Sequence, residues 1–180
     1  MSLVELIARA DARGLAASGL ACLDRCLPLL DGDDEVLRPL WATLADDTGD
    51  EAGPDWAGEL AQVRDKLAGT GGEGEDEAVL LARVMLADAP DACSGPALRT
   101  WADACSAAAL RVHRLLDPAA DTNGPAPLVA GELRRQVTVL DLLAAHGPAG
   151  LRPALEVSTE GRRVLRAVVS RRARGRDARL

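Results

Sequence analysis

Residues that favour β-strands are almost absent from this chain. Among its 180 residues there is no Phe and no Tyr, and Ile7 is the single isoleucine. Strands are rich in β-branched and aromatic side chains, so Val and Thr would have to build any sheet almost alone. No stretch alternates apolar and polar residues over six positions between turn residues, which is the pattern of a half-buried strand. We therefore expect an all-α fold with no β-sheet.

Apolar residues recur instead at helical spacing, three or four positions apart. Four such stripes are formed by Val36, Leu37, Leu40, Trp41 and Leu44; by Trp56, Leu60, Val63 and Leu67; by Leu98, Trp101, Cys105, Ala108, Val112 and Leu115; and by Val129, Leu133, Val137, Leu140 and Ala144. The pattern predicts seven to eight helices, near residues 3–13, 15–27, 35–46, 55–68, 76–88, 96–116, 127–146 and 158–174. They would form a bundle or a short helical array around a core of Leu, Val and Ala. The largest anchors of this core would be Trp41, Trp56 and Trp101.

Capping and turn residues agree with this division. Ser2 and Glu5 have the spacing of a capping box, and Ser158 is placed to cap the last helix. The dipeptide Gly-Pro occurs four times, at residues 53–54, 95–96, 124–125 and 147–148. Gly tolerates the turn after a helix and Pro suits the first turn of the next, so these pairs predict boundaries between helices.

A glycine cluster indicates how the chain is divided. Residues 69–75 (GTGGEGE) are typical of a flexible linker. This linker would separate an acidic N-terminal helical lobe, residues 1–68, from a C-terminal helical lobe, residues 76–180. The alternative is one compact domain. Some residues also repeat at an offset of 42, as in Gly53-Pro54 and Gly95-Pro96, which leaves a helix-pair repeat open.

Residues that commonly bind metals or carry catalysis are few and poorly spaced. Of the four cysteines, only Cys22 and Cys26 lie close together, and no second pair matches them as a structural zinc site requires. His113 falls on or beside the apolar stripe of its helix. His146 ends its helix, where a protonated imidazole would interact favourably with the helix dipole. We predict reduced cysteines in the core, no catalytic residue, no metal and no cofactor.

Acidic residues precede several of the predicted helices. Asp31, Asp33 and Glu35 alternate as at the start of a calcium-binding loop, but Val36 and Ala42 stand where that loop needs Gly and Glu. Acids just before a helix cap its first amides and favour its dipole, which is the better interpretation here.

Charge is distributed unevenly along the chain. The whole chain has a formal net charge of −7, yet residues 1–100 hold 20 acids against 8 bases and residues 101–180 hold 8 acids against 13 bases. The bases gather near the C-terminus, where the candidate contact residues for a partner or a polyanion are Arg162, Arg163, Arg166, Arg171, Arg172, Arg174 and Arg176. Such a helix can contact nucleic-acid phosphates. The alternative is that its arginines face water or pair with the acidic N-terminal part.

These features favour a non-enzymatic helical protein-interaction or regulatory module. Its partner would be a protein, either a second copy of the chain or another protein. The first alternative is a nucleic-acid-associated protein that uses the C-terminal arginines, and a further alternative is an enzyme with a dispersed carboxylate–arginine site. No apolar run approaches the ~18 residues that a membrane span needs, and we expect a cytoplasmic protein. The scarcity of residues with AT-rich codons indicates a GC-rich genome, so the excess of Arg (20) over Lys (1) carries less weight.

Overall fold

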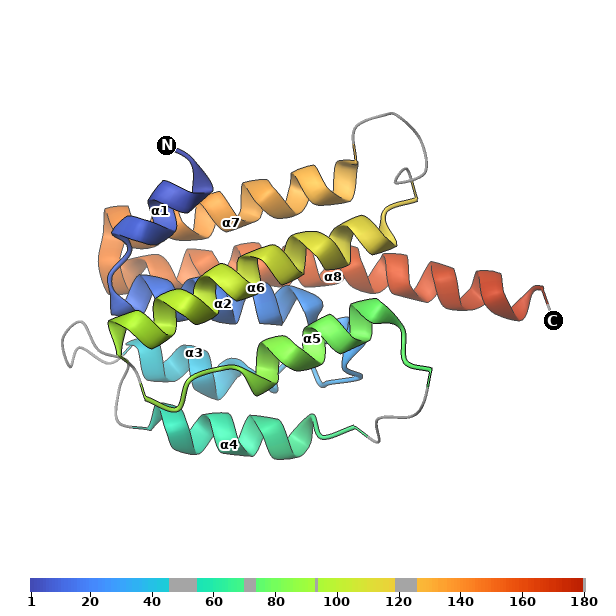
Figure 1. The fold of residues 1–180 in the computed structure, drawn as a ribbon, viewed down its shortest axis with the longest axis horizontal. Helices are drawn as coiled ribbons and strands as arrows, with labels where there is room; N and C mark the ends of the chain where they lie inside the picture. Colours follow the sequence, from blue (N-terminus) through green and yellow to red (C-terminus); the bar gives the residue numbers. More distant parts are fainter. Residues whose placement is uncertain (46–54, 70–73, 93, 119–125, 180) are drawn as a thin grey trace.

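The computed structural model describes residues 1–45, 55–69, 74–92, 94–118 and 126–179 (Figure 1). Within these ranges the chain forms α-helices and two short 3₁₀ helices, with no strand. The α-helices are α1 (Leu3–Arg9), α2 (Ala12–Cys26), α3 (Arg38–Ala45), α4 (Trp56–Lys66), α5 (Glu77–Ala87), α6 (Gly95–Leu116), α7 (Pro127–His146) and α8 (Leu151–Asp177); the 3₁₀ helices are η1 (Leu27–Leu29) and η2 (Gly147–Gly150). The predicted all-α fold is confirmed. Across the described ranges, no helix combines the length and apolar character needed to cross a membrane.

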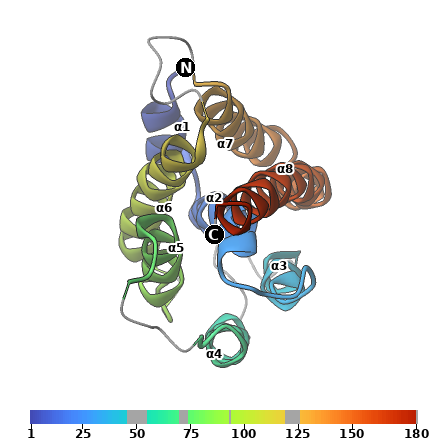
Figure 2. The same ribbon diagram turned by 90° about the vertical axis from the view of Figure 1, so that its right-hand side faces the viewer.

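Helix α2 lies in the middle of the molecule, with the other helices arranged around it (Figure 2). Every residue from Arg13 to Cys26 is buried, and the helix packs chiefly against α6 and α8. Many of its side chains are small, which lets neighbouring helices approach closely. Gly19 shows how closely: a Cβ atom at this position would lie 2.6 Å from the ring of Trp101.

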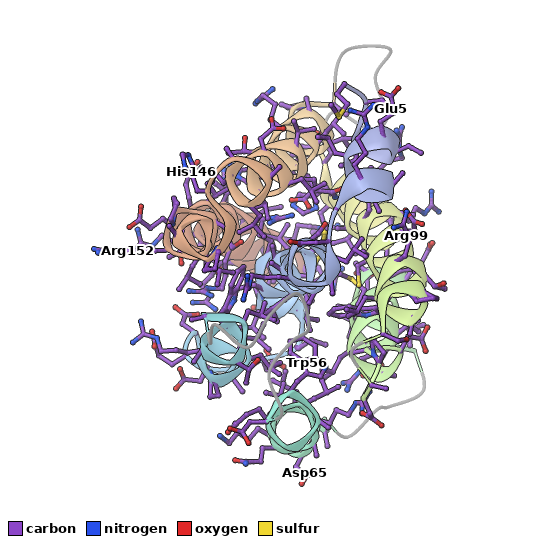
Figure 3. The ribbon with its side chains drawn as sticks, turned by 90° about the vertical axis from the view of Figure 1, so that its left-hand side faces the viewer. Glu5, Trp56, Asp65, Arg99, His146 and Arg152 are labelled. Atoms are coloured by element: carbon purple, nitrogen blue, oxygen red, sulfur yellow. The ribbon has the colours of Figure 1, made fainter. Side chains whose placement is uncertain are left out.

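The three tryptophans are buried, as predicted, and each indole N–H has an acceptor. Trp41 donates to Asp24 Oδ2 at 2.9 Å, Trp56 to the Pro90 carbonyl at 2.8 Å, and Trp101 to the Met85 carbonyl at 2.9 Å. Trp56 points from α4 into the molecule (Figure 3) and meets Trp101 edge to face, with ring centroids 6.2 Å apart. The tryptophans therefore anchor the core without leaving a polar atom unpaired.

Several helices begin where the capping residues predict. Ser2 and Glu5 form the expected capping box at the start of α1. Gly95 and Pro96 open α6, and Gly147 and Pro148 lie in the 3₁₀ turn between α7 and α8. The Gly-Pro pairs at 53–54 and 124–125 fall outside the described residues.

Helix α8 corrects the prediction for the C-terminal segment. The predicted start at residue 158 is wrong, because α8 begins at Leu151 and runs to Asp177. Pro153 did not prevent this, since a proline is tolerated in the first turn of a helix. Ser158 is buried in the middle of α8 rather than at its start, and its hydroxyl donates to the Ala154 carbonyl at 3.0 Å. The first boundary also moves, because Asp11 caps α2 and residues 12 and 13 belong to that helix.

Helix α7 has the predicted bounds but not the predicted inner face. Leu133 of the predicted stripe is 41% exposed. The buried residues of α7 are Gly131, Glu132, Gln136, Val139, Leu140 and Leu143. The face of α7 that packs against the core thus includes two polar residues, Glu132 and Gln136. They can be buried because their hydrogen-bond partners, Arg25 and Ser106, also lie inside the molecule.

The division into lobes and the 42-residue repeat stay predictions. Residues 70–73 of the predicted linker lie outside the described residues, and so does Gly53-Pro54 of the repeat.

Candidate interaction site on helix α8

Helix α8 consists of a packed part and a projecting part. Leu165 and Val168 are buried against the core, whereas every residue from Arg171 to Arg179 is exposed. Figure 1 shows the C-terminal end of α8 continuing past the neighbouring helices. After Val169 the sequence has no apolar stripe to pack, but Ala and Arg favour a helix and the preceding turns are already formed. We call residues 171–177 the basic end of α8.

Arg162 is the candidate contact residue that lies inside the molecule. Its Nη1 atom donates to the Asp24 carboxylate, which also accepts the Trp41 indole N–H. Arg162 Nε is buried, has no hydrogen-bond partner among the described residues and lies 3.6 Å from Asp34 Oδ1. This arginine joins α8 to α2.

Two further candidate arginines pair with acids of the N-terminal hundred residues. Arg166 Nη1 lies 2.5 Å from Asp34 Oδ1, in a half-exposed pair. Arg176 Nη2 lies 3.3 Å from Asp76 Oδ2, and the Arg176 side chain remains 67% exposed. Such exposed pairs contribute little to stability, so a partner can compete for Arg176 at small cost.

The remaining candidates are exposed on the surface of α8. Arg171 donates to the Ala167 carbonyl of its own helix, and Arg172 donates to the Leu115 carbonyl at the end of α6. Arg163 and Arg174 are exposed as well. The structure therefore gathers Arg171, Arg172, Arg174 and Arg176 on the basic end and separates them from Arg162.

A buried ion pair lies where α2 faces α7. Arg25 Nε donates to Glu132 Oε2 at 2.8 Å and Arg25 Nη2 to Glu132 Oε1 at 2.7 Å, and both side chains are fully buried. Burial raises the pKa of the Glu132 carboxyl, but the Arg25 guanidinium outweighs burial and holds that pKa below its usual value. Both groups are therefore charged at neutral pH.

Four more side chains complete this buried cluster, which we define as Arg25, Glu132, His113, Gln136, Ser106 and Ser158. Gln136 donates to Glu132 Oε1 at 2.9 Å and accepts the Ser106 hydroxyl at 2.6 Å. His113 Nδ1 lies 2.7 Å from the Ala109 carbonyl, and its Nε2 lies 3.6 Å from Glu132 Oε2. Burial lowers the pKa of His113, so the ring is neutral and donates from Nδ1.

The buried cluster holds helices together. Its members come from α2, α6, α7 and α8, and none is more than 6% exposed. A substrate cannot reach the ion pair without the helices separating. Sequence reasoning missed Arg25, Glu132 and Gln136; the four-residue spacing of the last two was available, but it identifies no partner.

The described cysteines lie in the core, as predicted. Cys22, Cys26 and Cys105 are free thiols and fully buried, whereas Cys93 lies outside the described residues. Burial raises the pKa of the Cys22 thiol to about 12 and that of Cys26 well above its usual value. These thiols are protonated at neutral pH and poor nucleophiles. Within the described ranges, His, Cys, Asp and Glu side chains form no group of three or more suited to a metal ion.

Acids before helix starts bind backbone amides. Asp33 Oδ1 accepts the Glu35 amide at 2.8 Å, and Asp76 accepts the Ala78 amide at the start of α5. The Asp76 contact caps α5 and agrees with the capping interpretation, whereas the Asp33 contact lies in the turn before α3, which begins at Arg38, so Asp33 does not cap that helix.

Comparison of the chain with models of protein families, with curated proteins and with solved structures found no match.

Proposed function

We propose that this chain is a non-enzymatic protein-interaction module and that the basic end of α8 contacts its partner. The observation that carries the proposal is the projection of this segment. Its residues add no apolar packing, yet they extend the helix by about 10 Å, at 1.5 Å per residue. A segment that contributes so little to the core is free to serve a contact.

The chemistry of the basic end suits an acidic protein surface. Arginine guanidinium groups form charge-assisted, two-pronged hydrogen bonds with carboxylates and are enriched in protein interfaces. The molecule already uses this chemistry at Asp76, which pairs with Arg176. A partner carboxylate would repeat that contact at the other exposed arginines.

Net charge favours a protein over a nucleic acid. The whole chain carries −7, so its long-range field repels a polyanion even though one end is basic. A nucleic acid would also need several phosphate contacts at once, whereas Arg162 is buried and Arg166 is paired with Asp34.

The location of the perturbed titratable groups supports a non-enzymatic role. Glu132, His113 and Cys22 all have displaced pKa values, and all lie within the core at 0–1% exposure. Their shifts follow from burial among helices, which is a structural cause.

Affinity capture with paired variants tests the proposal. The test variant is Arg174→Ala with Arg176→Ala, on the basic end. The control is Arg99→Ala with Arg152→Ala, two exposed arginines that Figure 3 shows at the opposite end of the molecule. We expect a protein that the wild type and the control bind equally from native extract. After purification, that protein should bind the test variant about fivefold to thirtyfold more weakly, since truncated interface arginines commonly cost 1–2 kcal/mol.

Tight binding to nucleic acid through the basic end would contradict the proposal. Binding to random duplex DNA or RNA is measured by fluorescence anisotropy at ~150 mM salt. Sub-micromolar binding that deletion of residues 171–180 abolishes would overturn the proposal. About five phosphate contacts would then give a log–log salt slope near −4 to −5.

A further inference from the structure

A pocket lies where α6 ends and α7 begins, against the side of α8. Its volume is about 690 Å³, which falls in the range of small-molecule sites. We call it the corner pocket. Figure 1 shows the end of α6 and the start of α7 on the same side of the molecule, near the point where α8 begins to project.

The walls of the corner pocket are apolar. They are formed by Leu115, Leu116, Pro127, Leu128 and Val168. Leu116 and Val168 belong to the buried core, while Leu115 and Leu128 are half-buried and pack against it. An alkyl chain inserted here would therefore contact the core directly and leave water.

One edge of the corner pocket is basic. Arg171, Arg172 and Arg179 line it, and all three are exposed. The hydrogen bond from Arg172 Nη1 to the Leu115 carbonyl, 3.1 Å long, holds that guanidinium beside the apolar wall. The acidic residue in the lining is Asp117, and its Oδ2 atom accepts a hydrogen bond from the Leu128 backbone N–H at 2.9 Å. The charges that face a ligand are thus mainly positive.

We propose that the corner pocket binds an amphipathic monoanion with one unbranched alkyl chain and a terminal carboxylate. The chain would occupy the apolar walls, and the carboxylate would meet the arginines at the edge through charge-assisted hydrogen bonds. A neutral apolar ligand would leave this basic edge unused. A polyanion would gain nothing from the leucines. This site shares Arg171 and Arg172 with the basic end of α8, but Arg174 and Arg176, which the protein-contact test replaces, do not line the pocket.

Isothermal titration calorimetry with decanoate, below its micelle concentration, tests the proposal. We expect one decanoate per chain and about tenfold weaker binding of octanoate, because two fewer methylenes are buried. Acetate, which has the charge without the chain, should give no measurable binding. Decyltrimethylammonium, which has the chain with the opposite charge, should also fail to bind.

Paired arginine variants test the location. Arg171→Ala with Arg179→Ala should weaken decanoate binding about tenfold or more. Arg174→Ala, on the same projecting segment but outside the lining, should leave it unchanged. Leu128→Arg, which obstructs the apolar wall, should abolish binding, and circular dichroism checks its fold. If Leu128→Arg does not fold, the arginine variants alone test where decanoate binds. Their side chains are exposed, so replacing them should not disturb the fold.

Three results would overturn the proposal. The first is the absence of saturable decanoate binding to the wild type. The second is equal weakening by Arg174→Ala, which would indicate a diffuse charge effect. The third is binding only to phosphatidylglycerol vesicles and not to free decanoate, which would indicate a membrane surface. No protein partner enters this experiment, so its failure leaves the proposed interaction function untouched.

Discussion

Arg25 donates two hydrogen bonds to the Glu132 carboxylate, and both side chains are fully buried, away from water. Removing two charges from water costs several kcal/mol per ion, and their attraction offsets that cost only when the geometry is good and the other polar atoms are paired. Gln136 and Ser158 supply such partners here. The pair therefore fixes how α2, α7 and α8 meet, whatever its net contribution to stability.

The pair makes a clear prediction for residue substitutions. Glu132→Ala leaves the Arg25 charge buried without a partner and should lower the free energy of unfolding by about 3–5 kcal/mol. Adding Arg25→Met removes that charge and should restore a large part of the loss. Urea denaturation of the wild type, the two single variants and the double variant measures both effects. If the double variant loses as much as the sum of the single variants, the two residues are not coupled as described.

His113 predicts a dependence of stability on pH. Its pKa in the fold is lowered from 6.5, so below pH 6.5 the unfolded chain binds a proton that the folded chain does not. Stability should therefore fall as the pH drops from 7.5 to 5.5, by at most about 1.4 kcal/mol per pH unit from this residue. His113→Gln should show a weaker fall, and the comparison cancels groups common to both proteins. Parallel pH curves for wild type and variant would show that His113 is not the cause.

The residues of the buried cluster could not be predicted from the sequence, whereas the tryptophans could. The burial of Trp41, Trp56 and Trp101 followed from apolar periodicity and size. The burial of Glu132 could not, because a glutamate on an inner face is stable only beside Arg25, 107 positions away. No local pattern contains that partner.

At the scale of elements, α2 depends on small residues for its central position. The ring of Trp101 occupies the space that a side chain at Gly19 would need. Gly19→Ala should therefore destabilise the protein by about 1–3 kcal/mol through overpacking, despite the better helix propensity of Ala. The control is Gly58→Ala in α4, where no atom lies within 4 Å of the new Cβ; it should stabilise by up to about 1 kcal/mol. Thermal denaturation reports both, and stabilisation by Gly19→Ala would contradict the packing described.

Helices differ in how much of them could be predicted. The bounds of α7 followed from Gly-Pro punctuation and periodicity, but its inner face did not, because polar residues occupy it. For α8, a serine with capping chemistry and a nearby proline indicated a start that is seven residues late. Ser158 instead bonds to its own helix at Ala154, which serine hydroxyls also do in helix interiors.

At the scale of the whole molecule, the uneven charge of the sequence becomes a set of pairs between distant segments. Arg162 pairs with Asp24, Arg166 with Asp34 and Arg176 with Asp76. The sequence predicted which residues carry the positive charge. It could not predict that Arg162 is buried while the basic end projects, because that division depends on where the core stops.

Deletion of residues 171–180 tests whether the basic end belongs to the fold. It removes the exposed contacts of Arg172 with Leu115 and of Arg176 with Asp76. We expect the free energy of unfolding to change by less than about 1 kcal/mol, because exposed pairs contribute little. Urea denaturation measures this change. A loss of several kcal/mol would show that the segment stabilises the core and is not free for a partner.

The most direct test of the interaction function is site-specific photo-crosslinking in native extract. One chain carries a photoreactive residue in place of Arg174, on the basic end, and a second carries it in place of Arg152, which is 90% exposed at the other end of α8. We predict a discrete protein adduct at position 174 and none at position 152, identified by mass spectrometry. A nuclease-sensitive adduct at 174, or the same adducts at both positions, would contradict the account.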